Sequence, residues 1–378
     1  MIGRLHTLVT LYKVPLAYSG FLLLFLISVL SRLLFNGMTF EFDYHLYQPD
    51  GAIYSYMALK YVGFSHLEAA QTVIDWYNVH AEPETKLNLA YFSSDSNPGV
   101  WSLVSSRIIY PLLSAPFVYQ FGIPGMLVVP ILSLFVVLLV LMRIAHRVDR
   151  LLLGLILTFL ITLSPTVTRW FAANITDGVL AAILGVAFYL VLTINHKLVW
   201  VPLITLVIVG SFTRFSAPYW IVFAIIYWFI QKKVAVLILF VTLLAVTPTL
   251  LARPDSNSIV VGGGSGIADK LMYFPISAFK VLFIEFAQLA SLDRSLLAIL
   301  VTAILISFLN PGRQSSQLFL LMGLAGWFIG ALNGVLGVNF RYQLPVIIFA
   351  CWVILDQLDI LRNIPLRNTM KISRSGTL

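Results

Sequence analysis

Residues 41–61 read EFDYHLYQPDGAIYSYMALKY, and this stretch organises the interpretation of the whole chain. Its first ten positions hold three acids, in a chain that has only 16 acids in all: Glu41, Asp43 and Asp50. At 3.6 residues per turn, Tyr54 and Ala58 lie on the same helical face as Asp50. The helix dipole also favours an acid at a helix start. We therefore expect a short helix with a carboxylate at its N-terminal end, beside a membrane.

The composition indicates a polytopic integral membrane protein. The chain has 378 residues, of which 60% are hydrophobic and 11% charged, and its mean hydropathy is +0.93. Soluble domains are nearer a quarter charged. The net charge of +8 is typical of basic residues retained on the cytoplasmic side of a membrane. These residues are dispersed among short loops, which argues against binding of nucleic acid. The single cysteine, Cys351, lies in an apolar run, where we expect it to be buried.

Ten apolar runs predict about ten transmembrane helices in an all-α fold. They are 16–35, 123–142, 151–165, 178–194, 198–213, 215–230, 234–251, 295–309, 317–337 and 344–361. Loops rich in Lys and Arg alternate with loops that lack them, which places both termini in the cytoplasm. Short loops and the lack of a cysteine pair favour a bacterial plasma membrane. We expect one polytopic membrane domain over 1–361 and a basic cytoplasmic tail over 362–378.

The first extracytoplasmic loop, residues 36–97, is much longer than a normal connection, and long ordered loops are usually functional. Two juxtamembrane amphipathic helices are expected in it, near 50–62 and 66–78. We interpret 98–121 as a re-entrant or surface-lying helix, because a full crossing would place the arginines of 143–150 outside. The same question stays open for 271–290, which contains Lys280 and Glu285.

Several charged residues fall on the predicted outer side, mostly near helix ends. They are Glu41, Asp43, Asp50, Arg107, Arg169, Asp177, Arg214 and Arg341. Each charge at bilayer depth costs about 2.5–3.5 kcal/mol, so we expect these groups to gather around a polar cavity. An arginine fork binds phosphate bidentately, and a carboxylate can take a proton from an attacking hydroxyl.

Five short motifs resemble segments of the GT-C superfamily of polytopic glycosyltransferases, which use polyprenyl-phosphate sugars. The motifs are PDGAIYSYMALKYVG (49–63), SSRIIYPLLSAPF (105–117), TRWFAANITDGVLAAI (168–183), FRYQLPV (340–346) and, more loosely, VGSFTRFSAPYW (209–220). Their order and their common sidedness carry the resemblance. Many members have a second acid after the first, where this chain has Gly51. Whether Asp43 or Glu41 fills that role, and whether a divalent metal is needed, stays open.

The resemblance implies a glycosyltransferase that moves a monosaccharide from a polyprenyl-phosphate donor to an acceptor hydroxyl on the extracytoplasmic face, with inversion. The acceptor would be a glycan, a lipid or a protein. Asp50, Asp43 and Asp177 are the candidate catalytic residues. Substrate binding is assigned to Glu41, Tyr54, Arg107, Arg214, Arg341 and Tyr342. The loop 252–294, which contains the glycine-rich VVGGGSGIADK (260–270), would cover the site.

Each of these residues has a plainer interpretation. Asp50 and Asp177 could be helix N-caps. Asp43 and Glu41 could be solvated loop acids, and Arg214 and Arg341 could be interfacial anchors that reach the headgroups. Arg107, inside an apolar segment, is harder to explain without a functional partner.

Two other classes of function remain as alternatives. A lipid-linked-sugar flippase or transporter predicts broken helices in matching halves and a site near the midplane. A structural subunit of an envelope complex would tolerate the loss of Asp50.

Overall fold

The structure is a computed structural model that describes residues 13–30, 49–79, 86–93, 101, 104, 107–193, 200–214, 219–223, 267–333 and 341–358. Regular structure in these residues is entirely helical, as predicted. The helices that these residues form include Lys13–Leu30, α3 (Pro49–Tyr61), α4 (His66–Asn78), η2 (Leu89–Phe92), α6 (Ile109–Phe121), η3 (Ile123–Leu127), α7 (Val128–Arg147), α8 (Leu151–Leu163), α9 (Pro165–Phe171), α10 (Asp177–Thr193), α11 (Trp200–Ser211), α14 (Ile267–Leu292), α15 (Arg294–Leu309), α16 (Gln314–Asn333), η6 (Arg341–Gln343) and α17 (Val346–Gln357).

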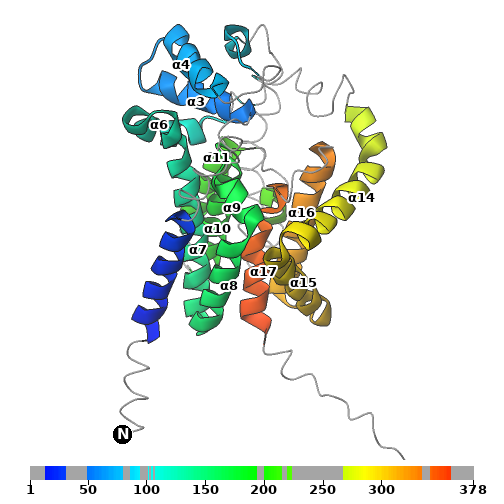
Figure 1. Cartoon of the computed structure of the whole chain (residues 1–378). Coiled ribbons are helices and arrows are strands. Elements are labelled where there is room, and N and C mark those ends of the chain that lie inside the picture. Colours follow the sequence, from blue (N-terminus) through cyan, green and yellow to red (C-terminus); the bar gives the residue numbers. More distant parts are fainter. Residues whose placement is uncertain are drawn as a thin grey trace, which may run out of the picture.

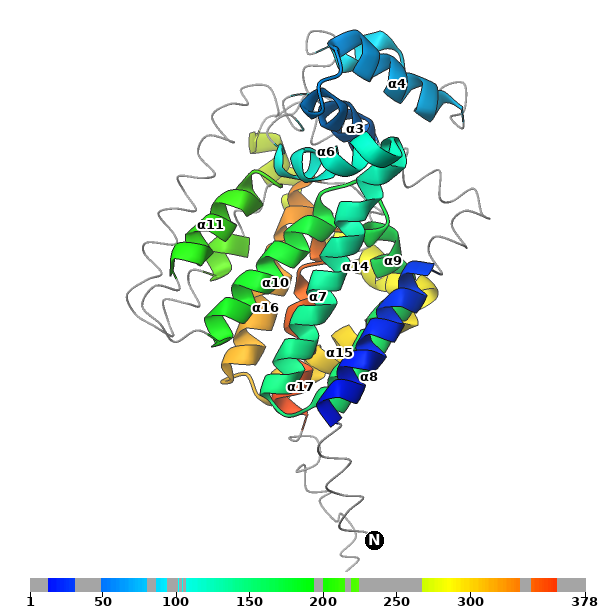
Figure 2. The same cartoon turned by 90° about the vertical axis from the view of Figure 1, so that its left-hand side faces the viewer.

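The helices form a bundle that is capped at one end by a second layer. Figures 1 and 2 show α7, α8, α10, α15, α16 and α17 running along the bundle, while α3, α4 and α6 lie across its upper end. The cap joins the bundle through η3, where Gly125 packs against α6. A Cβ at Gly125 would collide with the backbone oxygen of Phe117, so only glycine allows this close return of the chain.

The centre of the bundle is apolar on all sides. Every residue of α17 from Val346 to Leu355 is buried, and α10 is buried from Asp177 to Leu184. A helix that is apolar all round is stable only when other helices surround it. Cys351 is buried there, as predicted. These residues belong to one contiguous core that reaches from the bundle into the cap.

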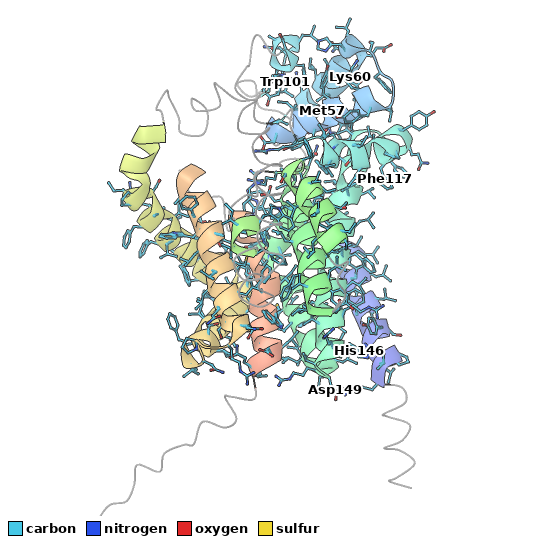
Figure 3. All side chains as sticks on the ribbon, turned by 180° about the vertical axis from the view of Figure 1, so that it is seen from behind. Met57, Lys60, Trp101, Phe117, His146 and Asp149 are labelled. Carbon is cyan, nitrogen blue, oxygen red and sulfur yellow. The ribbon has the colours of Figure 1, made fainter. Side chains whose placement is uncertain are left out.

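Two outer helices expose large apolar side chains instead. Lys13–Leu30 and the part of α14 from Pro275 to Leu292 bury only 17% and 22% of their residues. Phe279 and Phe283 on α14 are 70% and 67% exposed. Apolar surface on this scale marks contact with a partner or a membrane. In Figures 1 and 3, α14 leans away from the bundle toward its N-terminal end.

Within the described parts of the chain, three helices are long and apolar enough to cross a membrane: Lys13–Leu30, Ile123–Arg147 and Pro275–Leu292. A fourth span results if α8 and α9, which meet at 73°, are one broken crossing. Four other helices are apolar but short, including α17 with 12 residues. At 1.5 Å per residue α17 is ~18 Å long, well below the ~30 Å of a hydrocarbon core. Among the described residues, the structure therefore supports three or four spans by length and composition.

The cap confirms two helices that the sequence predicts near 50–62 and 66–78. Helix α4 begins with a complete capping box between Ser65 and Glu68, which satisfies two free backbone donors. Helix α3 differs from the expectation in one respect. It is not amphipathic, because all its residues from Gly51 to Leu59 are buried. Below it, α6 lies across the bundle end (Figure 2), in agreement with a surface-lying interpretation of 98–121.

The segment 252–294, expected as a covering loop, is helical over a large part of its length. Helix α14 occupies Ile267–Leu292, and its apolar composition qualifies Pro275–Leu292 as a span. From the sequence, whether 271–290 crosses the membrane is an open question, because the segment contains Lys280 and Glu285. The stretch 251–266 lies outside the described residues, as do 31–48, 224–250 and the tail 359–378.

Asp293 joins two helix starts at the break between α8 and α9. Its Oδ1 accepts from the backbone N of Leu296 at 3.0 Å and caps α15. Its Oδ2 accepts from the hydroxyl of Ser164 and, at 3.1 Å, from the backbone N of Thr166. At the 73° bend this carboxylate satisfies the backbone N–H of Thr166, which has no partner within its own helix.

The end of the bundle opposite the cap carries basic residues. Lys13 Nζ lies 2.8 Å from Asp149 Oδ1 in the turn after α7. Figure 3 shows His146 and Asp149 at this end and Lys60 of α3 at the other. The connections after α7 and α15 and the end of α17 also lie at this end (Figure 1). That this end faces the cytoplasm, as the alternation of basic loops indicates, stays a prediction.

Candidate functional site

Five charged side chains from five separate segments meet where the cap joins the bundle. They are Asp50 of α3, Arg107 just before α6, Asp177 at the start of α10, Arg214 just after α11 and Arg341 of η6. All five are site residues that the sequence predicts, and we call them the charge cluster. Their segments also touch through the backbone, since Ile109 N donates to Phe212 O at 3.4 Å.

Asp50 is loosely held by two arginines. Its Oδ2 lies 3.6 Å from Arg107 Nη1 and 3.4 Å from Arg341 Nη2. Strong N–H···O bonds between charged groups are nearer 2.7–2.9 Å. Arg107 Nη1 also donates to the hydroxyl of Tyr54 at 3.0 Å, one turn along α3 as the i, i+4 spacing predicts. The Asp50 side chain is 25% exposed, so this carboxylate keeps access to a ligand.

Asp177 is held much more tightly. Its Oδ2 accepts from Arg341 Nε at 2.9 Å, and its Oδ1 pairs with Arg214 Nη1. The side chain is only 3% exposed. Both oxygens are therefore occupied by guanidiniums, an arrangement that suits holding the arginines in place better than receiving a proton. Of the two carboxylates, Asp50 is the better candidate for a base.

Arg341 bridges the two acids and is supported by an aromatic ring. Its guanidinium carbon lies 5.4 Å from the ring centroid of Trp170, within the range of a cation–π contact. Arg169 lies over the same ring at 5.3 Å. Trp170 is not among the predicted site residues, although its position beside Arg169 near the end of α9 could have suggested an aromatic partner for an outer arginine.

Charge within the cluster is unbalanced. Three guanidiniums face two carboxylates, which leaves one formal positive charge and favours an anionic ligand. Burial alone would raise the pKa of Asp50. The three arginines outweigh burial, Arg107 most strongly, and hold the pKa of this carboxyl below its ordinary value. Asp50 is therefore ionised at neutral pH.

Arg107 retains binding capacity toward a ligand. It is buried, yet its Nε has no hydrogen-bond partner among the described residues. An unmet donor on a buried guanidinium is costly, and a phosphate oxygen is a partner of suitable charge and geometry.

A buried asparagine ties the cap to the loop before α10. Asn174 Nδ2 donates to Gly51 O at 3.0 Å and lies 2.9 Å from Ser55 Oγ, both on α3. Its Oδ1 accepts from the hydroxyl of Tyr110 at 2.7 Å. Asn174 is not among the predicted site residues, because a single polar residue in a loop carries no signal of burial.

Other predicted site residues cannot be placed. Glu41 and Asp43 lie outside the described residues, and for Tyr342 the structure describes only the backbone, within η6. Within the described ranges no group of three or more His, Cys, Asp and Glu could hold a metal ion. A role for the two first-loop acids, alone or with a divalent metal, therefore stays a prediction.

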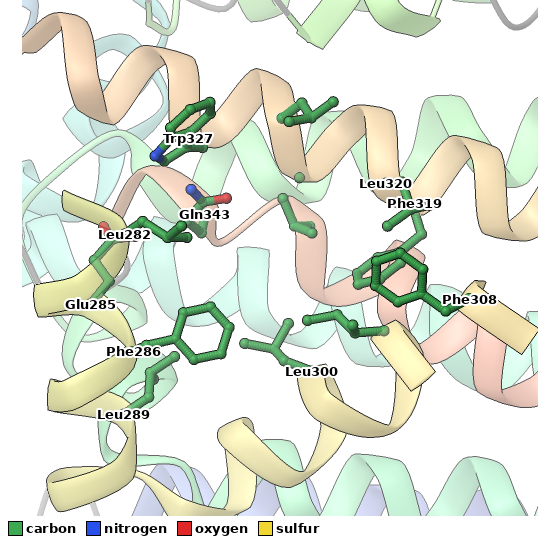
Figure 4. Close-up of a pocket in the computed structure, with 14 residues that line it drawn as sticks. Leu282, Glu285, Phe286, Leu289, Leu300, Phe308, Phe319, Leu320, Trp327 and Gln343 are labelled. Carbon is green, nitrogen blue, oxygen red and sulfur yellow. The ribbon is translucent and has the colours of Figure 1, made fainter. Parts of the chain in front are cut away.

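An apolar cavity of about 520 Å³ lies between α14, α15, α16 and the start of α17 (Figure 4). Its walls include Phe286, Leu300 and Phe319. Two polar side chains reach it, Glu285 and Gln343, and Gln343 lies only two residues after Arg341. The cavity volume is in the range of small-molecule sites. No motif in the sequence predicts this cavity, because its shape depends on how the side chains of α14, α15, α16 and α17 pack against one another.

Comparison of the chain with protein-family models, curated proteins and solved structures found no match.

Proposed function

We propose that this protein is a membrane glycosyltransferase that moves a monosaccharide from a polyprenyl-phosphate donor to an acceptor hydroxyl on the extracytoplasmic face. The proposal includes about ten spans with both termini in the cytoplasm. The convergence of three arginines and two carboxylates at the junction of cap and bundle carries it. Burying such a cluster beside a membrane costs free energy, and a bound phosphate would neutralise its excess positive charge.

The arginines would bind the donor phosphate. Arg107 Nε has no partner among the residues that the structure describes, and Arg341 holds Asp50 only at 3.4 Å, so both could turn toward an incoming phosphate. Guanidinium forks match phosphate oxygens. Donors that are already in place when negative charge develops are the most effective form of electrostatic stabilisation.

Asp50 would act as the base. The acceptor oxygen attacks the anomeric carbon and forms the new C–O bond, while the bond from that carbon to the phosphate oxygen breaks. Its electron pair leaves with the polyprenyl phosphate, and the acceptor proton passes to the Asp50 carboxylate. A single displacement of this kind inverts the anomeric configuration. A bound phosphate would also offset the arginines, and thereby raise the pKa of Asp50 toward a value that suits a base.

The apolar cavity is consistent with a lipid-linked donor. Its walls are hydrocarbon and aromatic groups, and its polar end at Gln343 adjoins the segment of Arg341. A donor with its phosphate at the charge cluster could place part of its prenyl chain there. The exposed apolar face of α14 gives such a chain a route from the bilayer.

The test is transfer of radiolabelled sugar from synthetic polyprenyl-phosphate donors by the purified protein. We expect Asp50→Asn to abolish transfer while the protein stays folded in detergent. Asp149→Asn is the matched control, since Asp149 is exposed at the opposite end of the bundle. Transfer that survives Asp50→Asn would move the base to Asp43 or Asp177. No transfer from any donor would refute the proposal.

The alternative is a transporter of lipid-linked sugars, and the break between α8 and α9 favours it. These helices meet at 73°, and α9 carries Trp170 against Arg341. Broken helices beside a charged site are common in transporters. Movement of lipid-linked sugar across proteoliposome bilayers, without any transfer, would support this alternative.

A further inference from the structure

Asn174 connects the two segments that carry the carboxylates of the charge cluster. Its Nδ2 reaches Gly51 O at 3.0 Å, and Gly51 directly follows Asp50. Three residues after Asn174 the chain reaches Asp177. A single buried amide thus sits between α3 and the start of α10, the two elements whose relative position determines how far apart the acids lie.

The same amide is held from the other elements of the cap. Its Nδ2 lies 3.2 Å from the hydroxyl of Tyr77 on α4, and its Oδ1 accepts from Tyr110 on α6. The Tyr110 ring in turn packs edge-on against Tyr54 at 5.3 Å. Asn174 is fully buried, so water cannot replace these contacts, and their loss would leave polar groups bare.

The spacing of the two acids matters because Arg341 bridges them with different nitrogens. Its Nε contacts Asp177 at 2.9 Å and its Nη2 contacts Asp50 at 3.4 Å. The guanidinium is a rigid planar fork. It can therefore meet both carboxylates only over a narrow range of separations.

We propose that Asn174 is a positioning residue that fixes α3 against the start of α10, so that Asp50 stays within reach of Arg341. The inference deepens the proposed function and rests on it for the role of Asp50 as the base. The geometric part concerns only where Asp50 lies, and it can be tested without any substrate.

Gly51 packs so closely against Asn174 that a larger residue has no room between α3 and the loop before α10. A Cβ on Gly51 would lie 3.0 Å from the backbone oxygen of Asn174 and 3.2 Å from its Cβ. Contacts this short force neighbours apart by a few tenths of an ångström. Alanine is also the better helix former, so Gly51→Ala should shift α3 away from Asn174 without weakening the helix itself.

The protonation of Asp50 reports its position. The charged and titratable groups that act on it or belong to its cluster are Arg107, Arg341, Arg214, Asp177, Tyr54 and Tyr91. An opposite charge within reach lowers a carboxyl pKa by roughly 1–3 units. If α3 moves away from Arg341, this effect weakens and burial raises the pKa, so the titration midpoint of Asp50 must move upward.

The experiment is a carboxyl titration of Asp50 by NMR in protein labelled with ¹³C at aspartate, with the signal assigned by Asp50→Asn. We expect the midpoint to rise by about one unit or more in Asn174→Ala, and to rise also in Gly51→Ala. Tyr77→Phe is the matched control. It removes one hydroxyl contact of Asn174 but leaves both contacts to α3, and its midpoint should equal that of the wild type.

The outcomes separate this inference from the proposed function. Unchanged midpoints in both folded variants, or an equal rise in Tyr77→Phe, would overturn it. If Asn174→Ala does not fold, Gly51→Ala alone decides. A wild type that transfers no sugar defeats the proposed function, whereas the titration still shows whether Asn174 positions Asp50.

Discussion

Replacement of Arg341 by lysine tests whether one guanidinium holds the site together. Lysine keeps the positive charge but offers one ammonium instead of a planar fork. It can remain with Asp177, the closer partner at 2.9 Å, but cannot also reach Asp50 at the position of Nη2. It also loses the flat stacking of the guanidinium over Trp170.

The structure allows the cost to be bracketed. The Asp50 contact is long and its carboxylate is 25% exposed, so its loss costs only about 0–1 kcal/mol. A weaker cation–π contact adds roughly 0.5–1 kcal/mol. Together these predict about 0.5–2 kcal/mol for Arg341→Lys. Arg341→Met removes the charge from a buried network and should cost about 3 kcal/mol, the lower end for broken buried pairs, because each acid keeps one other arginine.

The assay follows thermal unfolding with a thiol-reactive fluorophore. Cys351 is the single cysteine of the chain and is buried, so it reacts only when the bundle opens. At roughly 2–4 °C per kcal/mol, we expect Arg341→Lys to lower the Tm by roughly 1–8 °C, and Arg341→Met by more. Arg313→Lys and Arg313→Met, at an exposed arginine before α16, should leave the Tm unchanged.

One result would refute this reasoning. If Arg341→Lys and Arg341→Met both unfold within ~1 °C of the wild type, the bridge between the two acids contributes nothing and the cluster is not preorganised. An equal loss of Tm in the Arg313 variants would show that the effect is one of general charge, not of the bridge.

Three further predictions follow from the same geometry. The pKa of Asp50 is lowered in the folded protein, so its ionised carboxylate contributes stability that is fully present above the ordinary aspartate pKa. This stability is lost as the pH falls through the lower pKa of the folded state. The Tm of Asp50→Asn, measured from neutral to acidic pH, should therefore fall less steeply than the Tm of the wild type. For sidedness, the proposed topology predicts that an impermeant maleimide labels Lys60→Cys in intact cells but labels Asp149→Cys only after lysis, and the reverse pattern would invert the topology. Gly323→Leu should fill part of the apolar cavity, because an added Cβ at Gly323 meets nothing within 4 Å. We expect it to raise the KM for a long-chain polyprenyl donor several-fold and to leave the KM for a short-chain donor unchanged. Gly312→Leu, at a glycine that is equally open but outside the cavity, should leave both KM values unchanged.

Much of the candidate site could be predicted from the sequence because it consists of charges in an apolar chain. Asp50, Arg107, Asp177, Arg214 and Arg341 each stand out, since a charge near a membrane needs a compensating interaction. The pairing could not be predicted. Arg341 contacts Asp50 across a separation of 291 residues, and nothing local indicates that it also contacts Asp177.

The roles of uncharged residues could not be predicted from the sequence, because they also depend on contacts between separate segments. Asn174 and Trp170 are ordinary loop and helix residues in the sequence, and they gain importance only from what packs against them. Similarly, α3 was expected to be amphipathic, but its residues from Gly51 to Leu59 are buried on all sides. Whether the second face of a helix is covered depends on α4 and α6, not on its own periodicity.

The sequence by itself determined the helical class, the apolar composition of the helices that are long enough to span a membrane, and the two cap helices, because hydropathy, helical period and capping are local properties of the chain. Tertiary structure alone decided which helices are long enough to span, which acid is tightly held and which stays accessible, and where a cavity remains between α14 and the bundle. These features depend on where each helix ends and on how side chains of different helices pack against one another, and the order of residues along the chain does not determine either by itself.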